Sequence, residues 1–183
     1  MAGLTHRPAT HADLPALTAL MNRSIEELQR PFLDRSTLEA SKATMGLDTQ
    51  LIDDGTYFLI EAGGRLAGCG GWSARATLFG GDHSTGRDLR MLDPESEPAR
   101  VRAMYTHPDF ARRGVGRLVI GLCEDAARAA GFSSVVLVAT LAGEPFYRAC
   151  GYEQVERFEA PTPLGPVPLV RMRKSLGNPS LDA

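Results

Sequence analysis

The sequence predicts a single layered α/β domain, α+β in character with a mixed sheet, in the order β-α-α-β-β-β-α-β-α-β-β. Three observations support this prediction. Strand-forming segments alternate with segments of helical periodicity, one long amphipathic helix lies between two strand-like segments, and 183 residues suffice for one sizeable core but are short for two. We therefore expect one domain at residues 1–174, followed by a flexible tail at 175–183.

The first half of the chain is predicted to contain three strands and two helices. Apolar residues recur at spacings of three and four across 14–28, which is typical of one buried helix face. Residues 36–39 resemble a capping box and predict a second, short helix that ends near Gly46. Two glycines within 62–64 favour a hairpin turn. The expected elements are strands at 4–7, 56–61 and 65–79 and helices at 14–28 and 36–46.

The second half adds a long loop, two helices and four strands. Glycines, prolines and charges crowd residues 80–98, which predicts a loop that either covers a site or is simply mobile. An apolar stripe across 115–129, stopped by Gly131, predicts the clearest helix. The unit 99–139 should then join two parallel strands by a right-handed crossover. The expected elements are strands at 99–106, 134–139, 152–160 and 167–173 and helices at 114–130 and 144–150.

Charge and composition exclude several function classes. The net charge of −2 gives no general footprint for nucleic acid or a membrane surface, so we expect neither as a partner. The N-terminus has no apolar signal-peptide core, and no stretch approaches the roughly 20 apolar residues of a membrane span. Cys69, Cys123 and Cys150 are odd in number and have no metal-like spacing. We expect them to be reduced, buried thiols in a cytoplasmic protein.

Residues 105–120 carry the strongest functional signal. They read as a strand end, a loop rich in arginine and glycine, and the first turn of a helix. A helix start offers unpaired amides and the positive end of its dipole, while Gly114 and Gly116 let a ligand approach the main chain. The segment therefore predicts a cradle for a pyrophosphate, with an ordinary helix start after a turn as the alternative. A Walker loop or a Rossmann fingerprint fits poorly, because Arg117 follows Gly116 and Val119 replaces the third glycine.

Three segments, in the right order, resemble the GNAT superfamily of acyl-CoA-dependent N-acetyltransferases. Residues 101–110 resemble the family's fourth strand, and residues 112–117 (Arg-Arg-Gly-Val-Gly-Arg) resemble its pyrophosphate loop. Residues 144–152 (Glu-Pro-Phe-Tyr-Arg-Ala-Cys-Gly-Tyr) resemble its Phe-Tyr-x-x-x-Gly-Tyr/Phe segment. The element order agrees from about residue 4 to residue 174, so the resemblance implies a GNAT-like acyl-CoA N-acyltransferase fold over nearly the whole chain.

The resemblance implies acetyl-CoA as co-substrate and requires no metal. The backbone of Met104, Tyr105 and Thr106 would pair with the pantetheine arm, and an N–H there would polarise the thioester carbonyl. Tyr147 would be the general acid, because a phenol with a pKa of about 10 keeps its proton at neutral pH; core packing is its alternative role. The cradle for the pyrophosphate would consist of Arg112, Arg113, Gly114, Val115, Gly116 and Arg117.

The general base and the acceptor stay open at this point. Candidates for the base are Glu26, Glu27, Glu144, His107 and, within the long loop, His83, each of which is more often a solvated surface residue. Trp72 either lines the acceptor side or fills the core. The segments expected to form the acceptor pocket, 25–54 and 80–98, carry no recognisable signature. They fit a polyamine, an amino acid derivative, an antibiotic or a protein N-terminus.

The leading prediction is an N-acetyltransferase that moves an acetyl group from acetyl-CoA to a primary amine of a small molecule or peptide, by direct attack in a ternary complex. The alternative is a non-catalytic module that binds acyl-CoA as a sensor or regulatory partner. It stays open because Ala111 stands where the family loop usually has Gln or Arg, and because residues 140–143 lack the family's asparagine. A toxin-like enzyme that acts on aminoacyl-tRNA is disfavoured by the slightly acidic composition. The resemblance also allows a homodimer.

Overall fold

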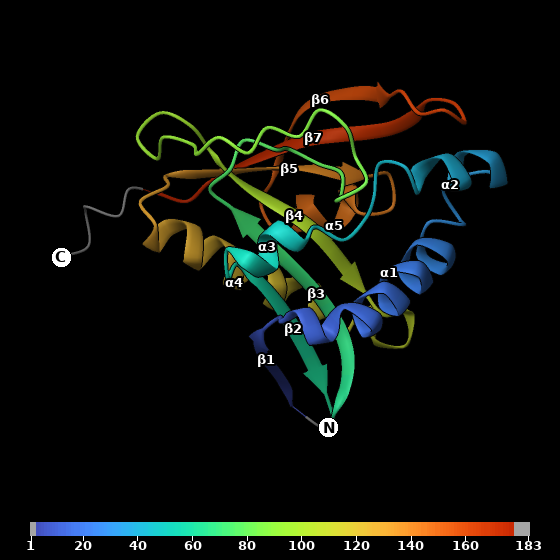
Figure 1. Cartoon of the computed structure of the whole chain (residues 1–183), viewed down its shortest axis with the longest axis horizontal. Helices are drawn as coiled ribbons and strands as arrows, with labels where there is room; N and C mark the ends of the chain where they lie inside the picture. The colour runs from blue at the N-terminus through green and yellow to red at the C-terminus, as the bar shows by residue number, and fades with distance from the viewer. Residues whose placement is uncertain (1–2, 178–183) are drawn as a thin grey trace.

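The computed structural model describes residues 3–177, which form a seven-stranded mixed sheet in the order β1-β2-β3-β4-β5-β7-β6 (Figure 1). The strands are β1 (Leu4–Pro8), β2 (Tyr57–Ala62), β3 (Arg65–Ser73), β4 (Ala99–Thr106), β5 (Ser134–Thr140), β6 (Glu153–Ala160) and β7 (Val167–Ser175). The α-helices are α1 (Leu14–Leu28), α2 (Arg35–Ser41), α3 (Thr49–Asp53), α4 (Val115–Ala129) and α5 (Glu144–Ala149). Single 3₁₀ turns, η1 (His11–Asp13) and η2 (Pro108–Phe110), precede α1 and α4. The predicted mixed α/β architecture is confirmed.

Within the domain, the bounds of two predicted elements need correction, and one short helix was missed. The second helix spans Arg35–Ser41 and does not reach Gly46. It begins at Arg35 because the carboxylate of Asp34 caps it by accepting the amide of Thr37 at 2.7 Å. The short helix α3 was not predicted, since its five residues are too few to show a periodic pattern. Strand β3 was predicted to reach residue 79 but ends at Ser73. The chain turns there, and the Ser73 hydroxyl accepts the amide of Arg75 at 3.0 Å.

The predicted tail at 175–183 starts too early. Ser175 still pairs with Ser134 at the end of β7, and the amide of Leu176 donates to the carbonyl of Ser133 at 2.8 Å. Leu176 is buried as part of the main core. Residues 178–183 lie outside the described residues.

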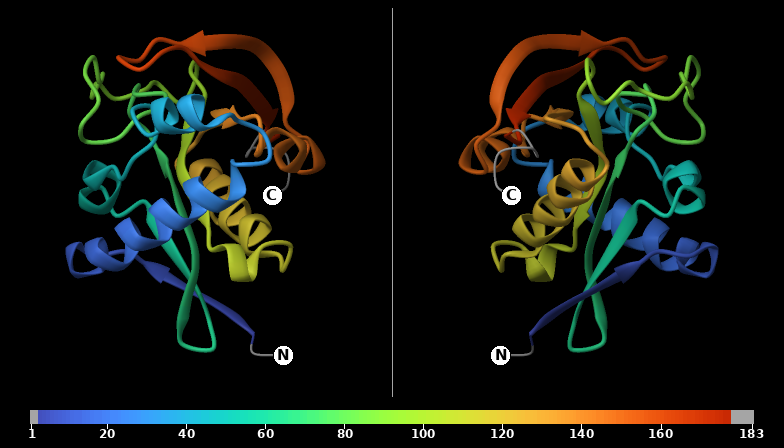
Figure 2. Two further views of the ribbon diagram at one scale, coloured as in Figure 1. Left: turned by 90° about the vertical axis from the view of Figure 1, so that its right-hand side faces the viewer. Right: turned by 90° about the vertical axis from the view of Figure 1, so that its left-hand side faces the viewer.

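Helices α1 and α4 cover opposite faces of the sheet (Figure 1). Successive strand residues point to opposite faces, so neighbours such as Leu59 and Ile60 in β2 enter different cores. Leu59 packs in the core beneath α1 with Leu17, whereas Ile60 packs in the core beneath α4 with Val119. Strands β6 and β7 form the end of the sheet furthest from β1 (Figure 2). Within residues 3–177, no helix has both the length and the apolar character of a membrane span.

Strands β4 and β5 are parallel, as predicted, but they pair over a very short distance. The ladder contains the pairs Ala99 with Val135 and Arg100 with Val136. Beyond them β5 pairs with β7 as far as Thr140, while β4 continues against β3 (Figure 1). The sheet therefore opens in its middle, and one backbone edge of β4 is left without a strand neighbour.

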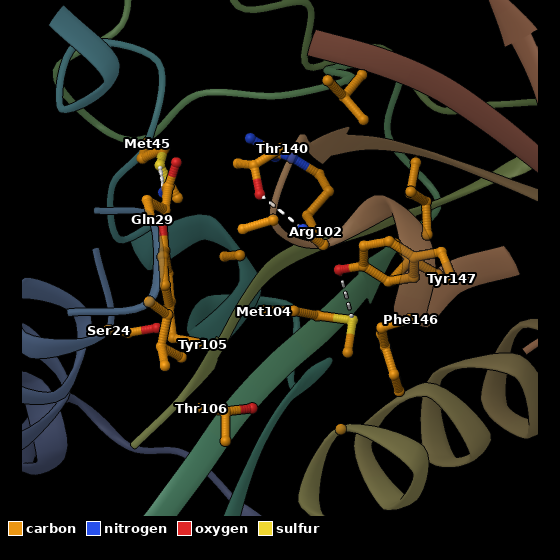
Figure 3. Close-up of a pocket in the computed structure, with 18 of the residues that line it drawn as sticks. Ser24, Gln29, Met45, Arg102, Met104, Tyr105, Thr106, Thr140, Phe146 and Tyr147 are labelled. Carbon is orange, nitrogen blue, oxygen red and sulfur yellow. Dashed lines mark hydrogen bonds between the residues drawn. The ribbon is translucent and has the colours of Figure 1, made fainter. Parts of the chain in front are cut away.

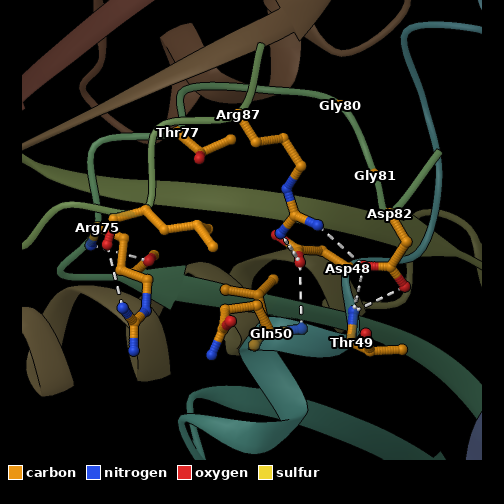
Figure 4. Close-up of polar contacts among 12 residues, drawn as sticks. Asp48, Thr49, Gln50, Arg75, Thr77, Gly80, Gly81, Asp82 and Arg87 are labelled. Atoms are coloured by element: carbon orange, nitrogen blue, oxygen red, sulfur yellow. Dashed lines mark hydrogen bonds and ion pairs between the residues drawn. The ribbon is translucent and has the colours of Figure 1, made fainter. Parts of the chain in front are cut away.

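The long loop between β3 and β4 is pinned to the domain by arginine–carboxylate pairs (Figure 4). Arg75 binds both carboxylate oxygens of Asp54, at 2.7 and 2.8 Å. Further along, Arg87 contacts Asp48 and also Asp82, the latter at 3.1 Å. Bidentate pairs of this kind fix geometry as well as charge. The loop has a defined path over α3, which the composition of 80–98 could not show.

Candidate active site

A cavity of about 790 Å³ lies where β4 and β5 separate (Figure 3). Residues from β4 form its floor, and β5, α1, the start of α4, helix α5 and the loops near residues 45 and 79 form its walls. Ser24, Gln29 and Met45 lie on one side and Phe146 and Tyr147 on the other, with Met104 between them. The cavity thus has two distinct sides that meet at the open edge of β4.

The predicted backbone site on β4 lies along this cavity, which Met104, Tyr105 and Thr106 all line. A β-bulge just before them places Ala103 at φ +51°, and the Tyr57 hydroxyl donates to the Ala103 carbonyl at 2.8 Å. Such a bulge re-aims the groups beside it and ends regular pairing. The open main-chain edge is therefore directed at the cavity.

The Tyr105 side chain has a structural role. Its hydroxyl accepts the amide of Gly46 at 3.0 Å and donates to the carbonyl of the same residue at 3.2 Å. The ring is buried in the core beneath α1, and burial raises the pKa of its phenol. These two hydrogen bonds fix the loop that carries Met45, so Tyr105 shapes the side of the cavity formed by α1.

The segment from Ala111 to Arg117 forms the predicted helix start. Arg112 has φ +63° and Gly114 has φ +84°, so the chain turns twice through the left-handed region before α4 begins. The Leu118 amide donates to the Gly114 carbonyl at 3.0 Å, which is the first turn of the helical ladder. The amides of Val115, Gly116 and Arg117 lie in the first turn, where no preceding helical carbonyl accepts their hydrogen bonds. They are therefore available to bind an anion.

The three arginines of the cradle do not lie together. Arg112 and Arg117 are exposed and line the cavity, whereas Arg113 lies over the ring of Phe110 at 5.6 Å and does not line it. Besides its predicted place in the cradle, Gly116 has a packing role. A Cβ there would lie 2.9 Å from the ring of Phe146, so the glycine is needed for the close packing of α4 against α5.

Tyr147 lies on α5 with its hydroxyl 3.6 Å from the sulfur of Met104 (Figure 3). Its ring meets those of Phe146 and Tyr152 edge to face, at 5.1 and 5.9 Å between centroids. Burial raises the pKa of its phenol, because the charged phenolate is disfavoured away from water. Tyr147 thus keeps its proton at neutral pH and presents it beside the floor of the cavity.

The structure brings none of the candidate bases into the cavity. Among residues 3–177, no Asp, Glu, His or Lys lines it. Glu144 is buried away from it; burial alone would raise the pKa of this carboxyl, but hydrogen bonds from Arg148 and Arg157 hold it below its usual value. The two other acidic candidates pair on the surface of α1, Glu26 with Arg30 and Glu27 with Arg23.

The histidine candidates and Trp72 also lie elsewhere. His107 caps η2 by accepting the Asp109 amide at 3.2 Å, and its other ring nitrogen lies 3.2 Å from Arg23. His83 contacts the carbonyl of Ala43 at 3.2 Å. Trp72 fills the core, where it packs against the ring of Phe132 at 6.1 Å, so the core alternative holds.

Sequence reasoning missed Arg102, a charged residue in β4 that lines the cavity and is buried. Its guanidinium contacts the carboxylate of Asp48 and donates to the carbonyl of Gly80 at 2.8 Å. The Asp48 side chain is fully buried and contacts Arg87 as well. An arginine inside a strand was the one available signal, because such a charge needs a buried partner.

Comparisons with known proteins agree with this geometry. The model of a family described as Acetyltransferase (GNAT) family matches residues 18–152. No curated protein gives a significant match. Similar solved structures include a GCN5-related N-acetyltransferase from Rhodopseudomonas palustris, with a TM-score of 0.70 and 19% identity over 96% of this chain and 97% of that one.

Two further solved structures have the same fold. The ribosomal-protein-S18-alanine N-acetyltransferase from Escherichia coli has a TM-score of 0.60 and 15% identity over 99% of both chains. The yncA protein from Salmonella typhimurium, solved with its cofactor acetyl-CoA, has a TM-score of 0.62 and 19% identity over 97% of this chain and 96% of that one. At such identities the likeness concerns the fold alone, and it confirms the predicted architecture.

Proposed function

The chain belongs to the acetyltransferase (GNAT) family, and from this premise we propose that it transfers an acetyl group from acetyl-CoA to a primary amine by direct attack in a ternary complex. One observation carries the proposal. A single cavity joins a helix start suited to an anion, an open strand edge and a protonated tyrosine. The acetyl-CoA complex of the structurally similar yncA protein supports the choice of donor.

The groups that line the cavity match the chemistry of acetyl-CoA. The amides of Val115, Gly116 and Arg117, together with the side chains of Arg112 and Arg117, offer hydrogen bonds and positive charge to a pyrophosphate. The backbone edge from Met104 to Thr106 offers amides and carbonyls to an amide-containing arm, in the manner of a strand added to a sheet. These groups together would hold the donor.

The same residues supply what the transfer needs. When bound, acetyl-CoA supplies an activated acetyl thioester, whose carbon forms a bond to the acceptor nitrogen as the bond to sulfur breaks. An amide of the β4 edge would stabilise the developing negative charge on the carbonyl oxygen. Tyr147 would give its proton to the departing sulfur and regain one from water. The proton lost by the amine passes to water, since no carboxylate or imidazole among the described residues lines the cavity.

Release of free thiol from acetyl-CoA, measured against a panel of primary amines, tests the proposal. We expect amine-dependent release together with saturable binding of CoA in calorimetry. Binding of CoA with no thiol release from any amine would instead support the acyl-CoA sensor. Failure of the folded protein to bind CoA at all would refute both functions.

A further inference from the structure

The side of the cavity remote from α4 has an unusual charge for a pocket that takes an amine. Among residues 3–177, the charged side chains that line the cavity are Arg102, Arg112 and Arg117. Arg112 and Arg117 belong to the helix start that we propose binds the pyrophosphate. Arg102 is thus the one charge left for the opposite side, and it is positive.

The charge of Arg102 is fixed in place. Its side chain is 3% exposed, and it shares the carboxylate of Asp48 with Arg87, whose side chain is 17% exposed. Arg87 also pairs with Asp82 at 3.1 Å, so two guanidinium groups face two carboxylates and the buried carboxylate of Asp48 is fully engaged within this cluster. Among the described residues, no free carboxylate lines the cavity to pair with a second cation, and burying an unpaired charge costs several kcal/mol.

The rest of this side is mainly apolar. Helix α1 contributes Leu28 and the turn after it contributes Phe32. The two loops contribute Met45 and Phe79, and strands β5 and β7 contribute Val138 and Leu169. Gln29 and Ser24 are neutral polar residues among them, and the Gln29 amide nitrogen lies 2.9 Å from the Met45 sulfur. Phe32 and Phe79 are 50% and 36% exposed, so their rings are available to cover an apolar group. The wall favours contact with hydrocarbon over contact with charge.

We propose that the acceptor is a monoamine with an apolar substituent, and that polyamines and other polycationic amines are excluded. This inference rests on the proposed function, because it concerns the acceptor of that same transfer. The apolar wall would bind the substituent, while a second ammonium would find no free carboxylate among the described residues that line the cavity. The primary amine itself would lie near Met104, where the two sides of the cavity meet.

A matched pair of amines tests this directly. In cadaverine an ammonium takes the place of the terminal methyl group of hexylamine, so the two differ in charge at nearly constant length. With acetyl-CoA as donor, we expect kcat/KM for hexylamine to exceed that for cadaverine by at least about tenfold. Equal values, or a preference for cadaverine, would overturn the inference and leave the acetyltransferase function intact. Absence of thiol release from both amines, and from the wider panel, would overturn the function itself.

A charge placed in the wall should reverse the preference. Phe79→Asp introduces a carboxylate at the cavity, so kcat/KM for hexylamine should fall and that for cadaverine should rise. Leu89→Asp is the matched control, because Leu89 is an exposed apolar residue of the same loop, 44% exposed, that does not line the cavity. It should leave the ratio of the two amines unchanged. An unchanged ratio in Phe79→Asp, or an equal change in Leu89→Asp, would show that the wall does not select the acceptor.

Discussion

The hydroxyl of Tyr147 lies 3.6 Å from the sulfur of Met104, a contact that joins helix α5 to the open edge of β4. A thioether is a weak acceptor, so this contact holds the phenol without engaging it strongly. The hydroxyl is therefore free to change partner when a ligand lies along β4. This contact supports the proposal that Tyr147 gives its proton to the departing sulfur.

Tyr147→Phe should lower kcat by about 10²–10⁴-fold, which is the usual contribution of a positioned acid. The ring stays, so its packing with Phe146 and Tyr152 and the affinity for CoA should be unchanged. Thiol-release kinetics and calorimetry measure the two quantities. A variant with normal kcat would remove Tyr147 from the chemistry.

The pH dependence of kcat/KM should follow the ionisation of the acceptor amine. Without a carboxylate or imidazole lining the described cavity, the amine must arrive neutral, so kcat/KM should rise about tenfold per pH unit up to the pKa of the amine itself. Because burial raises the pKa of Tyr147, no loss of the acid is expected below pH 10. Two amines of different pKa should show midpoints that differ by the same amount. A common midpoint for both would reveal an enzyme base.

The cradle arginines should contribute unequally to CoA binding. Arg117→Ala should raise the Kd for CoA about fivefold, the effect of losing roughly 1 kcal/mol from an exposed charge pair, and should reduce its salt dependence. Arg113→Ala should have little effect, because Arg113 lies over Phe110 outside the cavity. Calorimetry at two salt concentrations decides between them. Equal losses would mean that the helix start binds its anion differently.

Gly114 should matter through its backbone. Gly114→Ala meets open space but must adopt φ +84°, so it should destabilise the fold by about 1–2 kcal/mol and weaken CoA binding by shifting the helix start. Gly121→Ala, in the interior of the same helix and also in open space, should instead stabilise by roughly 0.5–1 kcal/mol and leave CoA binding unchanged. Urea denaturation and calorimetry test both. The same effect in both variants would refute the conformational explanation.

The buried charge cluster should be essential to stability. Asp48→Asn can still cap α3 through the Gln50 amide, but it removes the countercharge of Arg102, so we expect a loss of about 3–5 kcal/mol in unfolding free energy. Asp53→Asn, whose side chain is 53% exposed, should change stability by less than ~0.5 kcal/mol. A small effect at Asp48 would show that water reaches Arg102.

Local chemistry made much of this fold predictable. Gly114, Gly131 and Gly151 all have positive φ, and each marks a helix boundary that the sequence indicates. The hairpin at residues 62–64 and the buried strand at 134–139 also follow from residue type alone. Helices, strands and turns that depend on nearby residues could therefore be predicted from the sequence.

The site depended on contacts between distant segments, and there the sequence was less informative. Asp48 and Arg102 are 54 residues apart, and nothing local to either indicates that they meet. The candidate bases were chosen for their chemistry, but whether a carboxylate enters a cavity is decided by partners such as Arg148 and Arg157 beside Glu144. The fixed path of the long loop likewise follows from ion pairs that join separate elements.

Because β4 separates from β5, part of the β4 edge has backbone groups without a strand partner. This unpaired edge lies in the middle of the sheet and not at its outer strands. An exposed edge at the outer strand of a sheet can pair with strands of other molecules, which leads to aggregation. This one is shielded by α1 on one side and α5 on the other, so a thin, extended molecule can lie along it while a second sheet cannot. The backbone arrangement of β4 and β5 alone would therefore favour narrow, extended ligands, whatever side chains line the cavity.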